Sequence, residues 1–226
     1  NFTKIFNQFE FGATHSTGLR NPTLYELYGT DNFGIAGNVN LNPEKSKTNE
    51  LSVKYNYSTN LIFYSTAYRT TVFDQIETNS AYSQHENMQI DINQEGLENK
   101  LLFEGNGQIF SIFNNFSKSR KTNGQAQSRR PDLSYGINYL KKVNKSPLGK
   151  FNFNLNYKYT GKYIDWDESK NSRQKSTDII NLIFSKNLFG NNYYLNISNL
   201  LDEKYEKPAT YSQDGRRIKL GFKKVY

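Results

Sequence analysis

The chain has 226 residues and a formal net charge of +8, with 17 Tyr, 16 Phe, one Trp, one Met and no Cys. Its mean hydropathy is -0.81, and this hydrophilic yet aromatic composition disfavours a soluble core, which is usually filled with Leu, Ile, Val, Ala and Met. No segment approaches the roughly 20 apolar residues of a membrane helix, which excludes a helical membrane protein, and the sequence contains no signal peptide.

Strict alternation of apolar and polar residues is the clearest pattern along the chain. Phe151, Phe153 and Leu155 alternate with Asn152 and Asn154, and a period of two places every second side chain on the same face of a strand. The alternation predicts ten strands. In chain order they are 6–17, 50–57, 61–76, 88–103, 108–118, 132–139, 151–159, 177–188, 193–198 and 217–226.

The connections between the predicted strands alternate in length. Long or intermediate connections are expected at 19–48, 77–87, 119–130, 165–176 and 202–215, with one turn of helix at 23–28. Shorter ones are expected at 58–60, 105–107, 143–150 and 189–192. Outer-membrane barrels have short periplasmic turns and longer extracellular loops, so the long set is expected outside the cell and the chain is expected to end in the periplasm.

These patterns predict an all-β fold, an antiparallel transmembrane β-barrel meander that occupies residues 1–226 as a single unit. In lipid the edges of such a meander must be closed, because unpaired backbone groups there cost several kcal/mol each. Ten strands either close by themselves or form the last part of a larger barrel. The strand-like pattern that is already present around Phe6 favours the larger barrel.

Four blocks of sequence carry a resemblance to TonB-dependent receptors. Segment 17–29, TGLRNPTLYELYG, resembles the family's strand-to-loop motif, although Leu19 replaces the usual aromatic residue and Asn21 the usual small one. Segments 40–46 (NLNPEKS), 95–98 (EGLE) and 199–205 (NLLDEKY) are similar to later blocks of the family and occur in the same order. A final strand with aromatic residues Phe222 and Tyr226 follows.

The resemblance implies the C-terminal part of a 22-stranded barrel whose lumen is plugged. The plug domain, the export signal and the segment that contacts the energy-transducing TonB complex are then expected outside this chain. The expected function is uptake of a scarce nutrient, such as cobalamin or an iron–siderophore, across the outer membrane of a Gram-negative cell. No cofactor and no nucleic-acid partner are expected.

Ligand contact in this family comes from extracellular loops and the lumen mouth. The resemblance therefore makes Arg20, Tyr25, Tyr28, Trp166 and Tyr211 the candidate ligand-binding residues, because aromatic faces suit macrocycles or aromatic chelates and Arg suits anionic groups. Interfacial anchoring by the aromatic residues is the structural alternative. Phe222 and Tyr226 are the candidate signal for the barrel-assembly machinery.

The net charge of +8 has two interpretations, a solvated surface or a surface that binds anionic lipid or ligand. Contact with lipopolysaccharide and other outer-membrane lipid is expected at a basic segment that ends the fifth predicted strand and continues into the next loop. Its residues are Lys118, Arg120, Lys121, Arg129 and Arg130.

No catalytic or metal-binding constellation is predicted, because the chain has only two His and no Cys. His15 falls in register with the apolar face, and the acidic residues Asp165, Asp167 and Glu168 around Trp166 indicate a solvated loop tip. Two other functions stay open. One is a self-standing barrel protease of the omptin kind, which needs an Asp/His pair that activates water, and the other is a passive porin or structural barrel.

Overall fold

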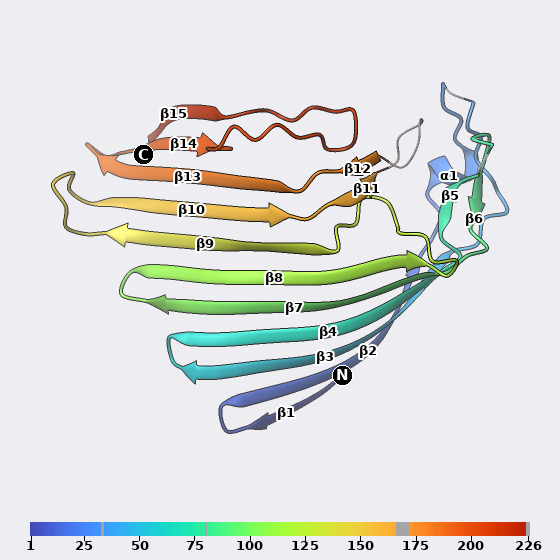
Figure 1. Cartoon of the computed structure of the whole chain (residues 1–226), viewed down its shortest axis with the longest axis horizontal. Coiled ribbons are helices and arrows are strands. Elements are labelled where there is room, and N and C mark those ends of the chain that lie inside the picture. The colour runs from blue at the N-terminus through green and yellow to red at the C-terminus, as the bar shows by residue number, and fades with distance from the viewer. Residues whose placement is uncertain (33, 80, 166–171, 225–226) are drawn as a thin grey trace.

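The computed structural model describes residues 1–32, 34–79, 81–165 and 172–224. Its main feature is one antiparallel sheet of eleven strands in which each strand pairs with the next strand of the meander (Figure 1). The strands are β1 (Phe2–Phe6), β2 (Phe9–Arg20), β3 (Glu44–Ser58), β4 (Leu61–Phe73), β7 (Ile92–Gly105), β8 (Gln108–Lys121), β9 (Leu133–Val143), β10 (Phe151–Thr160), β13 (Thr177–Leu188), β14 (Asn191–Ser198) and β15 (Arg217–Lys224).

Two small hairpins and one short helix lie in the long connections. The hairpins are β5 (Ile76–Thr78) with β6 (His85–Asn87) and β11 (Tyr163–Asp165) with β12 (Ser172–Gln174), and the helix is α1 (Leu24–Tyr28). Helix α1 is the single helical turn predicted at 23–28, and Thr23 caps its N-terminus. Among the described residues no helix has the length and apolar character needed to span a membrane.

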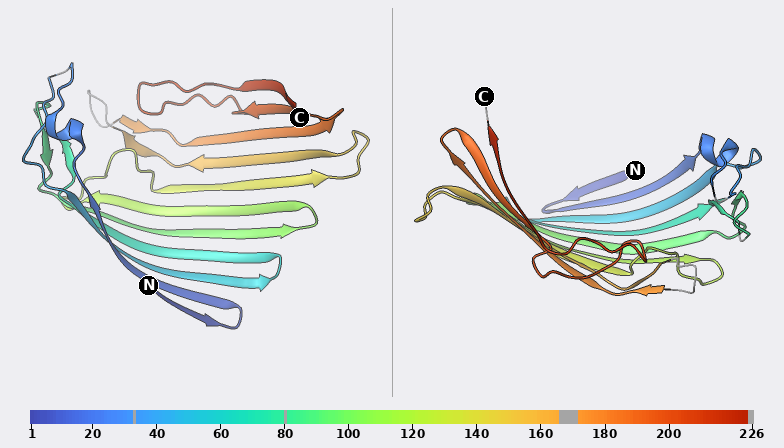
Figure 2. Two further views of the ribbon diagram at one scale, coloured as in Figure 1. Left: turned by 180° about the vertical axis from the view of Figure 1, so that it is seen from behind. Right: turned by 90° about the horizontal axis from the view of Figure 1, so that it is seen from above.

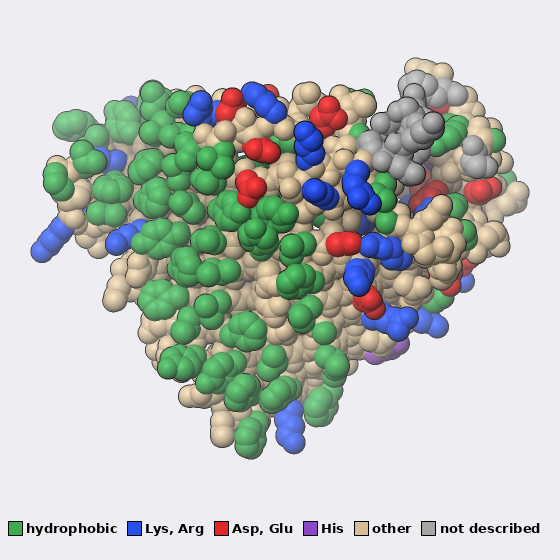
Figure 3. Space-filling view, viewed as in Figure 1, with side chains coloured by type: hydrophobic (Ala, Val, Ile, Leu, Met, Phe, Trp, Pro, Cys, Tyr) green, Lys and Arg blue, Asp and Glu red, His purple; other side chains and the backbone are tan. Residues whose placement is uncertain are grey.

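The pairing register gives the sheet two chemically different faces. On the first face, Leu155 pairs with Tyr139 and Leu182, and the same row continues through Ile197 to Ile218. We call this the apolar face. Space-filling colours show apolar side chains over most of it, with charged side chains gathered toward the end that carries the long connections (Figure 3). In β9, β10, β14 and β15 the register therefore confirms the predicted alternation.

The opposite face, which we call the polar face, carries hydroxyl, amide and charged side chains. Its amides form a ladder across three strands, in which Asn156 donates to Asn138 and Asn181 Nδ2 donates to Asn156 Oδ1 over 3.4 Å. Hydrogen bonding of this kind satisfies polar groups that would otherwise be costly to remove from water.

Burial is concentrated in the long connections and at their junctions with the sheet. Among the described residues the buried apolar side chains are Leu41, Ile76, Ile92 and Ala209, whereas Leu220 on the apolar face is 81% exposed. A soluble monomer rarely leaves so continuous an apolar surface in water. The apolar face is suited to contact with another apolar phase, and lipid is such a phase.

The two ends of the sheet differ as predicted. Two-residue turns at 7–8, 59–60, 106–107 and 189–190, together with the 144–150 connection, lie at one end. Long connections at 21–43, 74–91, 122–132, 161–176 and 199–216 lie at the other. Asn106 and Gly107 have φ of 51° and 69°, the left-handed geometry that tight hairpin turns require. The C-terminal strand runs toward the short-turn end.

Two details differ from the sequence-based prediction. The strand predicted at 6–17 is β2 and begins at Phe9, and an additional strand, β1, precedes it, because Asn7, with φ of 53°, turns the chain between β1 and β2. The strand predicted at 61–76 ends earlier, as β4 at 61–73, and the strand predicted at 88–103 begins later, as β7 at 92–105. The reason is that residues 74–91 fold back and contain the β5–β6 hairpin. The sheet curves strongly and leaves β1 and β15 at its two edges (Figure 2).

Candidate ligand-binding site

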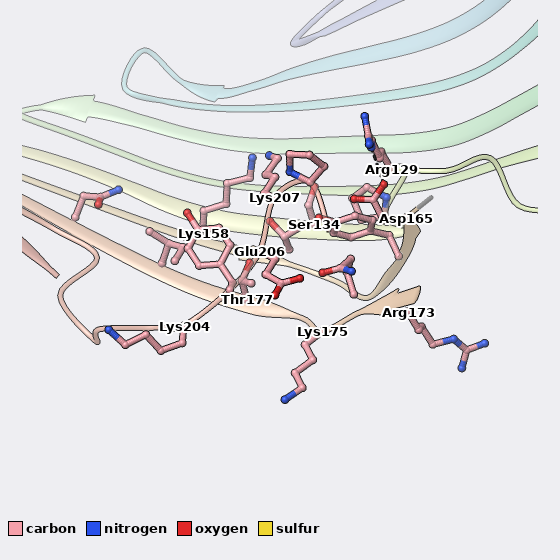
Figure 4. A pocket seen from close by; sticks show the side chains of 18 of the residues that line it. Arg129, Ser134, Lys158, Asp165, Arg173, Lys175, Thr177, Lys204, Glu206 and Lys207 are labelled. Carbon is pink, nitrogen blue, oxygen red and sulfur yellow. Dashed lines mark hydrogen bonds and ion pairs between the residues drawn. The ribbon is translucent and has the colours of Figure 1, made fainter. Parts of the chain in front are cut away.

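A cavity of about 950 Å³ lies on the polar face where β9, β10 and β13 meet the long connections. Its floor is formed by side chains of the polar face, among them Ser134, Asn156, Lys158 and Thr177. Segments 129–131, 163–165, 173–175 and 204–208 form its rim. Figure 4 shows the residues that surround it.

A buried carboxylate joins the three long connections that carry the rim. Asp165, whose side chain is fully buried, accepts a 2.6 Å hydrogen bond from Nε of Arg129 and a 2.7 Å hydrogen bond from the amide of Ala209. The three residues belong to the 122–132, 161–176 and 199–216 connections. A buried carboxylate is stable only when it is paired and hydrogen-bonded, so Asp165 fixes the relative position of the three loops that form the rim.

The 199–216 connection is organised by two residues of the NLLDEKY block. The side chain of the buried Asn199 accepts a 2.9 Å hydrogen bond from the amide of Glu203 and donates to the Glu203 and Asp214 carbonyls. Asp202 accepts a 2.7 Å hydrogen bond from the Arg216 amide, which lowers the pKa of its carboxyl group. The block therefore ties together the two ends of the loop that carries Lys204 and Lys207.

The cavity lining is basic. Among the lining residues that the structure describes, two are acidic, Asp165 and Glu206, and six are basic. The basic residues are Arg129, Lys158, Arg173, Lys175, Lys204 and Lys207. The lining thus has a formal charge of 6 − 2 = +4, and walls of one charge sign concentrate counter-ions of the other.

The six basic side chains are not equivalent. Arg129 is paired with Asp165, and Lys204 Nζ lies 3.1 Å from a carboxylate oxygen of Asp202. In Figure 4, Lys158 and Lys207 extend in the same direction, whereas Lys175 extends the opposite way. Lys158 and Lys207 both line the cavity without an ion pair to any carboxylate that the structure describes, and each ammonium offers an anionic group three N–H donors.

Neutral donors complete the site. Burial raises the pKa of the Tyr163 phenol, and the nearby Asp165 carboxylate raises it further, so the phenol stays protonated and can donate a hydrogen bond. Thr177 and Asn181 add hydroxyl and amide groups on the floor. The arrangement can bind a polar, negatively charged molecule.

The predicted ligand-binding residue Arg20 lies elsewhere, in a cluster that anchors the first long connection. Its guanidinium donates two 2.7 Å hydrogen bonds to Glu44 and also bonds Glu26 over 3.0 Å. Glu44 in turn accepts a 2.8 Å hydrogen bond from the Ile76 amide. Partial burial acts to raise the pKa of Glu26, but hydrogen bonds from Arg20 and Thr23 outweigh it and lower that pKa to about 2.

The other predicted contacts are separate from the cavity lining. Tyr25, Tyr28 and Tyr211 are 48%, 68% and 66% exposed, so their rings remain available at the long-connection end. Trp166 lies outside the described residues. The structure therefore groups Arg20, Tyr25 and Tyr28 around α1 and leaves Tyr211 on a different loop.

The two His residues have neutral partners. His15 Nδ1 lies 2.8 Å from Asn49 Oδ1 on the apolar face, and the His85 ring stands edge-on to Tyr25 at 5.7 Å. Within the described part of the chain neither His forms an ion pair with a carboxylate, and no group of three or more His, Asp or Glu is placed to hold a metal ion.

The predicted basic segment is divided among different partners. Arg120 pairs with Asp132 at 2.7 Å and Lys121 with Glu77 at 3.3 Å, while Arg129 belongs to the cavity rim. Lys118 lies opposite Glu95 on β7. Of the two candidate assembly-signal residues, Phe222 lies on the apolar face, 6.0 Å from the Tyr193 ring, and Tyr226 lies outside the described residues.

Sequence reasoning missed most of the basic residues of the cavity. Lys158 belongs to an alternating strand and indicates only a polar face, whereas Arg173, Lys175 and Lys207 lie in two otherwise uninformative connections. A weak signal was present, since Lys and Arg recur in each of the last long connections. The sequence alone gives no reason for these loops to converge.

Comparison with known proteins agrees with this architecture. The family model described as "TonB dependent receptor-like, beta-barrel" matches residues 3–200. No curated protein sequence matches the chain.

Solved structures share the fold at low sequence identity. The FrpB iron transporter from Neisseria meningitidis (F3-3 variant) has a TM-score of 0.73 and 15% identity, with coverage of 97% of this chain and 37% of that one. The ferripyoverdine receptor of the outer membrane of Pseudomonas aeruginosa has a TM-score of 0.72 and 16% identity, and the match covers 96% of this chain and 31% of that one. The ferric-catecholate import receptor Fiu from K12 E. coli has a TM-score of 0.73 and 13% identity, and the match covers 97% of this chain and 33% of that one.

The chain thus spans about a third of the length of these structures. The family model covers far more than half of the chain, and the order of its strands, the length of its connections and its two-faced sheet all agree with that match. The chain belongs to the TonB-dependent receptor-like β-barrel family.

Proposed function

We propose that the chain is part of an outer-membrane receptor that takes up a scarce nutrient with energy from the TonB complex. The basic cavity on the polar face carries this proposal. If the sheet forms part of a 22-stranded barrel, the polar face lines the lumen and the cavity lies at the extracellular mouth, where an incoming ligand arrives.

The charge of the cavity favours an anionic metal chelate, such as an iron–siderophore, over neutral or cationic nutrients. Lys158 and Lys207 provide ammonium groups, and Tyr163 provides a neutral donor. The similar structures include an iron transporter, a ferripyoverdine receptor and a ferric-catecholate import receptor, which supports iron as the metal. Cobalamin is the second choice, because it offers less negative charge to a lining of formal charge +4.

The remaining predicted contacts and partners form part of the same proposal. Tyr25, Tyr28, Tyr211 and Trp166 are proposed to contact the ligand before it reaches the cavity, while Arg20 orders the first loop. The TonB complex acts through an N-terminal part of the receptor. The barrel-assembly machinery recognises the C-terminal strand, and Lys118 and Arg130 contact lipopolysaccharide.

Uptake by cells that carry the full-length receptor tests this proposal. The double variant Lys158→Gln/Lys207→Gln removes two cavity charges, and Lys100→Gln/Lys219→Gln is the matched control, because these two lysines lie on the polar face outside the cavity lining. We expect the apparent affinity for a radiolabelled anionic ferric chelate to fall roughly fivefold or more in the cavity variant. The maximal rate and the control are expected to stay unchanged.

Three results would contradict the proposal. They are TonB-independent uptake, equal behaviour of the two double variants, and failure of the wild-type receptor to transport ferric chelates. Uptake of cobalamin and of no ferric chelate would support the receptor function but contradict the proposed anionic ferric ligand.

A further inference from the structure

An apolar groove of about 710 Å³ lies on the apolar face at the short-turn end of the sheet. Its walls include Phe151 of β10, Phe184 of β13, Leu195 of β14 and Leu220 of β15, with Leu148 from the 144–150 connection. Leu148 and Leu220 are 70% and 81% exposed. The groove therefore presents contiguous apolar surface that is open along its length, which suits an extended hydrocarbon chain.

Lysine side chains adjoin the groove. Lys186 lines it, and the ammonium of Lys186 donates one hydrogen bond to the carbonyl of Leu148. An ammonium has three N–H donors, so two remain for a ligand. Lys141 lies in the same row of the apolar face, because it pairs with Phe153, which in turn pairs with Phe184. Lys145 is exposed in the adjoining 144–150 connection.

The charge around the groove is of one sign. The sequence contains no Asp or Glu at 133–164, 179–201 or 217–226. Strand β13 contains Asp178, but this residue pairs with Tyr159 at the long-connection end of the sheet. The short-turn ends of β9, β10 and β13 therefore combine apolar walls with Lys141 and Lys186, and these parts of the strands contain no Asp or Glu.

We propose that this groove binds an anionic phospholipid of the periplasmic leaflet, with an acyl chain along the apolar walls and the phosphate against Lys186 and Lys141. A phosphate carries several acceptor oxygens, and charge-assisted hydrogen bonds to such oxygens are stronger than neutral ones. A zwitterionic lipid fills the same walls but adds an ammonium group among lysines. The inference rests on the membrane placement of the proposed function, in which the short connections face the periplasm.

Lipid retention by the full-length receptor tests this site. The receptor is reconstituted in bilayers of equal parts phosphatidylglycerol and phosphatidylcholine, extracted in mild detergent, and its bound lipids are counted by native mass spectrometry. The variant Lys141→Gln/Lys186→Gln removes two charges at the groove. The control Lys100→Gln/Lys219→Gln removes two charges from the polar face, and Lys141→Arg/Lys186→Arg keeps the charge at the groove.

We expect the wild type, the control and the Arg variant to retain phosphatidylglycerol in preference to phosphatidylcholine. The Gln variant is expected to lose that preference by about fivefold for each Lys removed. Equal retention of the two lipids by the wild type would overturn the proposal, because the groove then holds any hydrocarbon. Equal losses in the two Gln variants would also overturn it, because net charge and not the groove then selects the lipid.

The lipid assay requires no nutrient and no TonB, so its failure is distinguishable from failure of the proposed function. A receptor that retains phosphatidylglycerol without transporting a chelate refutes only the proposed function. A receptor that transports a chelate while retaining both lipids equally refutes only the lipid site.

Discussion

The guanidinium of Arg20 at the end of β2 donates two 2.7 Å hydrogen bonds to the carboxylate of Glu44 at the start of β3. Arg20 and Glu44 come from two different blocks of the family resemblance and close the base of the loop between them. A planar guanidinium matches a carboxylate through two parallel bonds, which a Lys ammonium does not reproduce.

Arg20→Lys is therefore expected to loosen the first long connection while keeping its charge. The cost is about 1 kcal/mol, because the Arg20 side chain is 43% exposed and solvent weakens the pair. Hydrogen–deuterium exchange is expected to increase at the amide of Ile76, which donates to Glu44. Unchanged exchange at Ile76 together with a large loss of ligand affinity would instead assign Arg20 to ligand binding.

Glu26 gives the same loop a defined pH dependence. Its pKa is about 2 in the folded protein against an ordinary value of 4.5. A lowered folded pKa contributes stability that is fully present above 4.5 and is lost as the pH falls through about 2. The amide of Thr23 donates to Glu26 over 2.7 Å, so the Thr23 amide proton shift in an NMR titration is expected to change near pH 2.

The matched variant is Glu26→Gln, which keeps the shape of the side chain and removes its titration. The change of the Thr23 shift in the acidic range is expected to disappear in this variant. A midpoint near 4.5 in the wild type would mean that Arg20 does not hold the Glu26 carboxylate in solution.

Asp165→Asn is expected to loosen the rim of the cavity. The amide side chain keeps nearly the same volume but gives up the charge that pairs with Arg129, and a hydrogen bond to a charged group is worth about 1.5–3 kcal/mol. The directly observable consequence is faster hydrogen exchange at the Ala209 amide, which donates to Asp165.

Asp214→Asn is the control for this experiment. Asp214 lies in the same loop as Ala209 and pairs with Arg217 of β15, but its side chain is 69% exposed. An exposed pair of this kind contributes little stability, so exchange at Ala209 is expected to match the wild type. If Asp214→Asn and Asp165→Asn accelerate Ala209 equally, the buried carboxylate does not hold the rim together.

Most of the fold could be predicted from the sequence because a sheet with one apolar and one polar face imposes a period of two on its strands. In β10, Phe153, Leu155 and Tyr157 were assigned to one face and Asn154 and Asn156 to the other, and the register places them there. The separation of β1 from β2 was not predicted. Phe2–Phe6 is short, and only the left-handed Asn7 separates it from β2.

The candidate site was less predictable because it depends on convergence of segments far apart in the chain. Arg129 and Asp165 are 36 residues apart, and Asp165 and Ala209 are 44 apart. Exposed aromatic residues such as Tyr211 were prominent in the sequence, but the cavity is lined largely by Lys, Arg and small polar residues. Charge in loops usually indicates only solvent exposure, so Lys175 and Lys207 could not be recognised as site residues from the sequence.

The central claim is that one face of the sheet contacts lipid and the other does not. The chain has no Cys, so single Cys variants at positions 153 to 158 of β10 can each carry a fluorescent label in the full-length receptor. Lipids with a nitroxide on the acyl chain are expected to quench labels at Phe153, Leu155 and Tyr157 and to spare those at Asn154, Asn156 and Lys158. Equal quenching at all six positions, or quenching of the second set alone, would contradict the account.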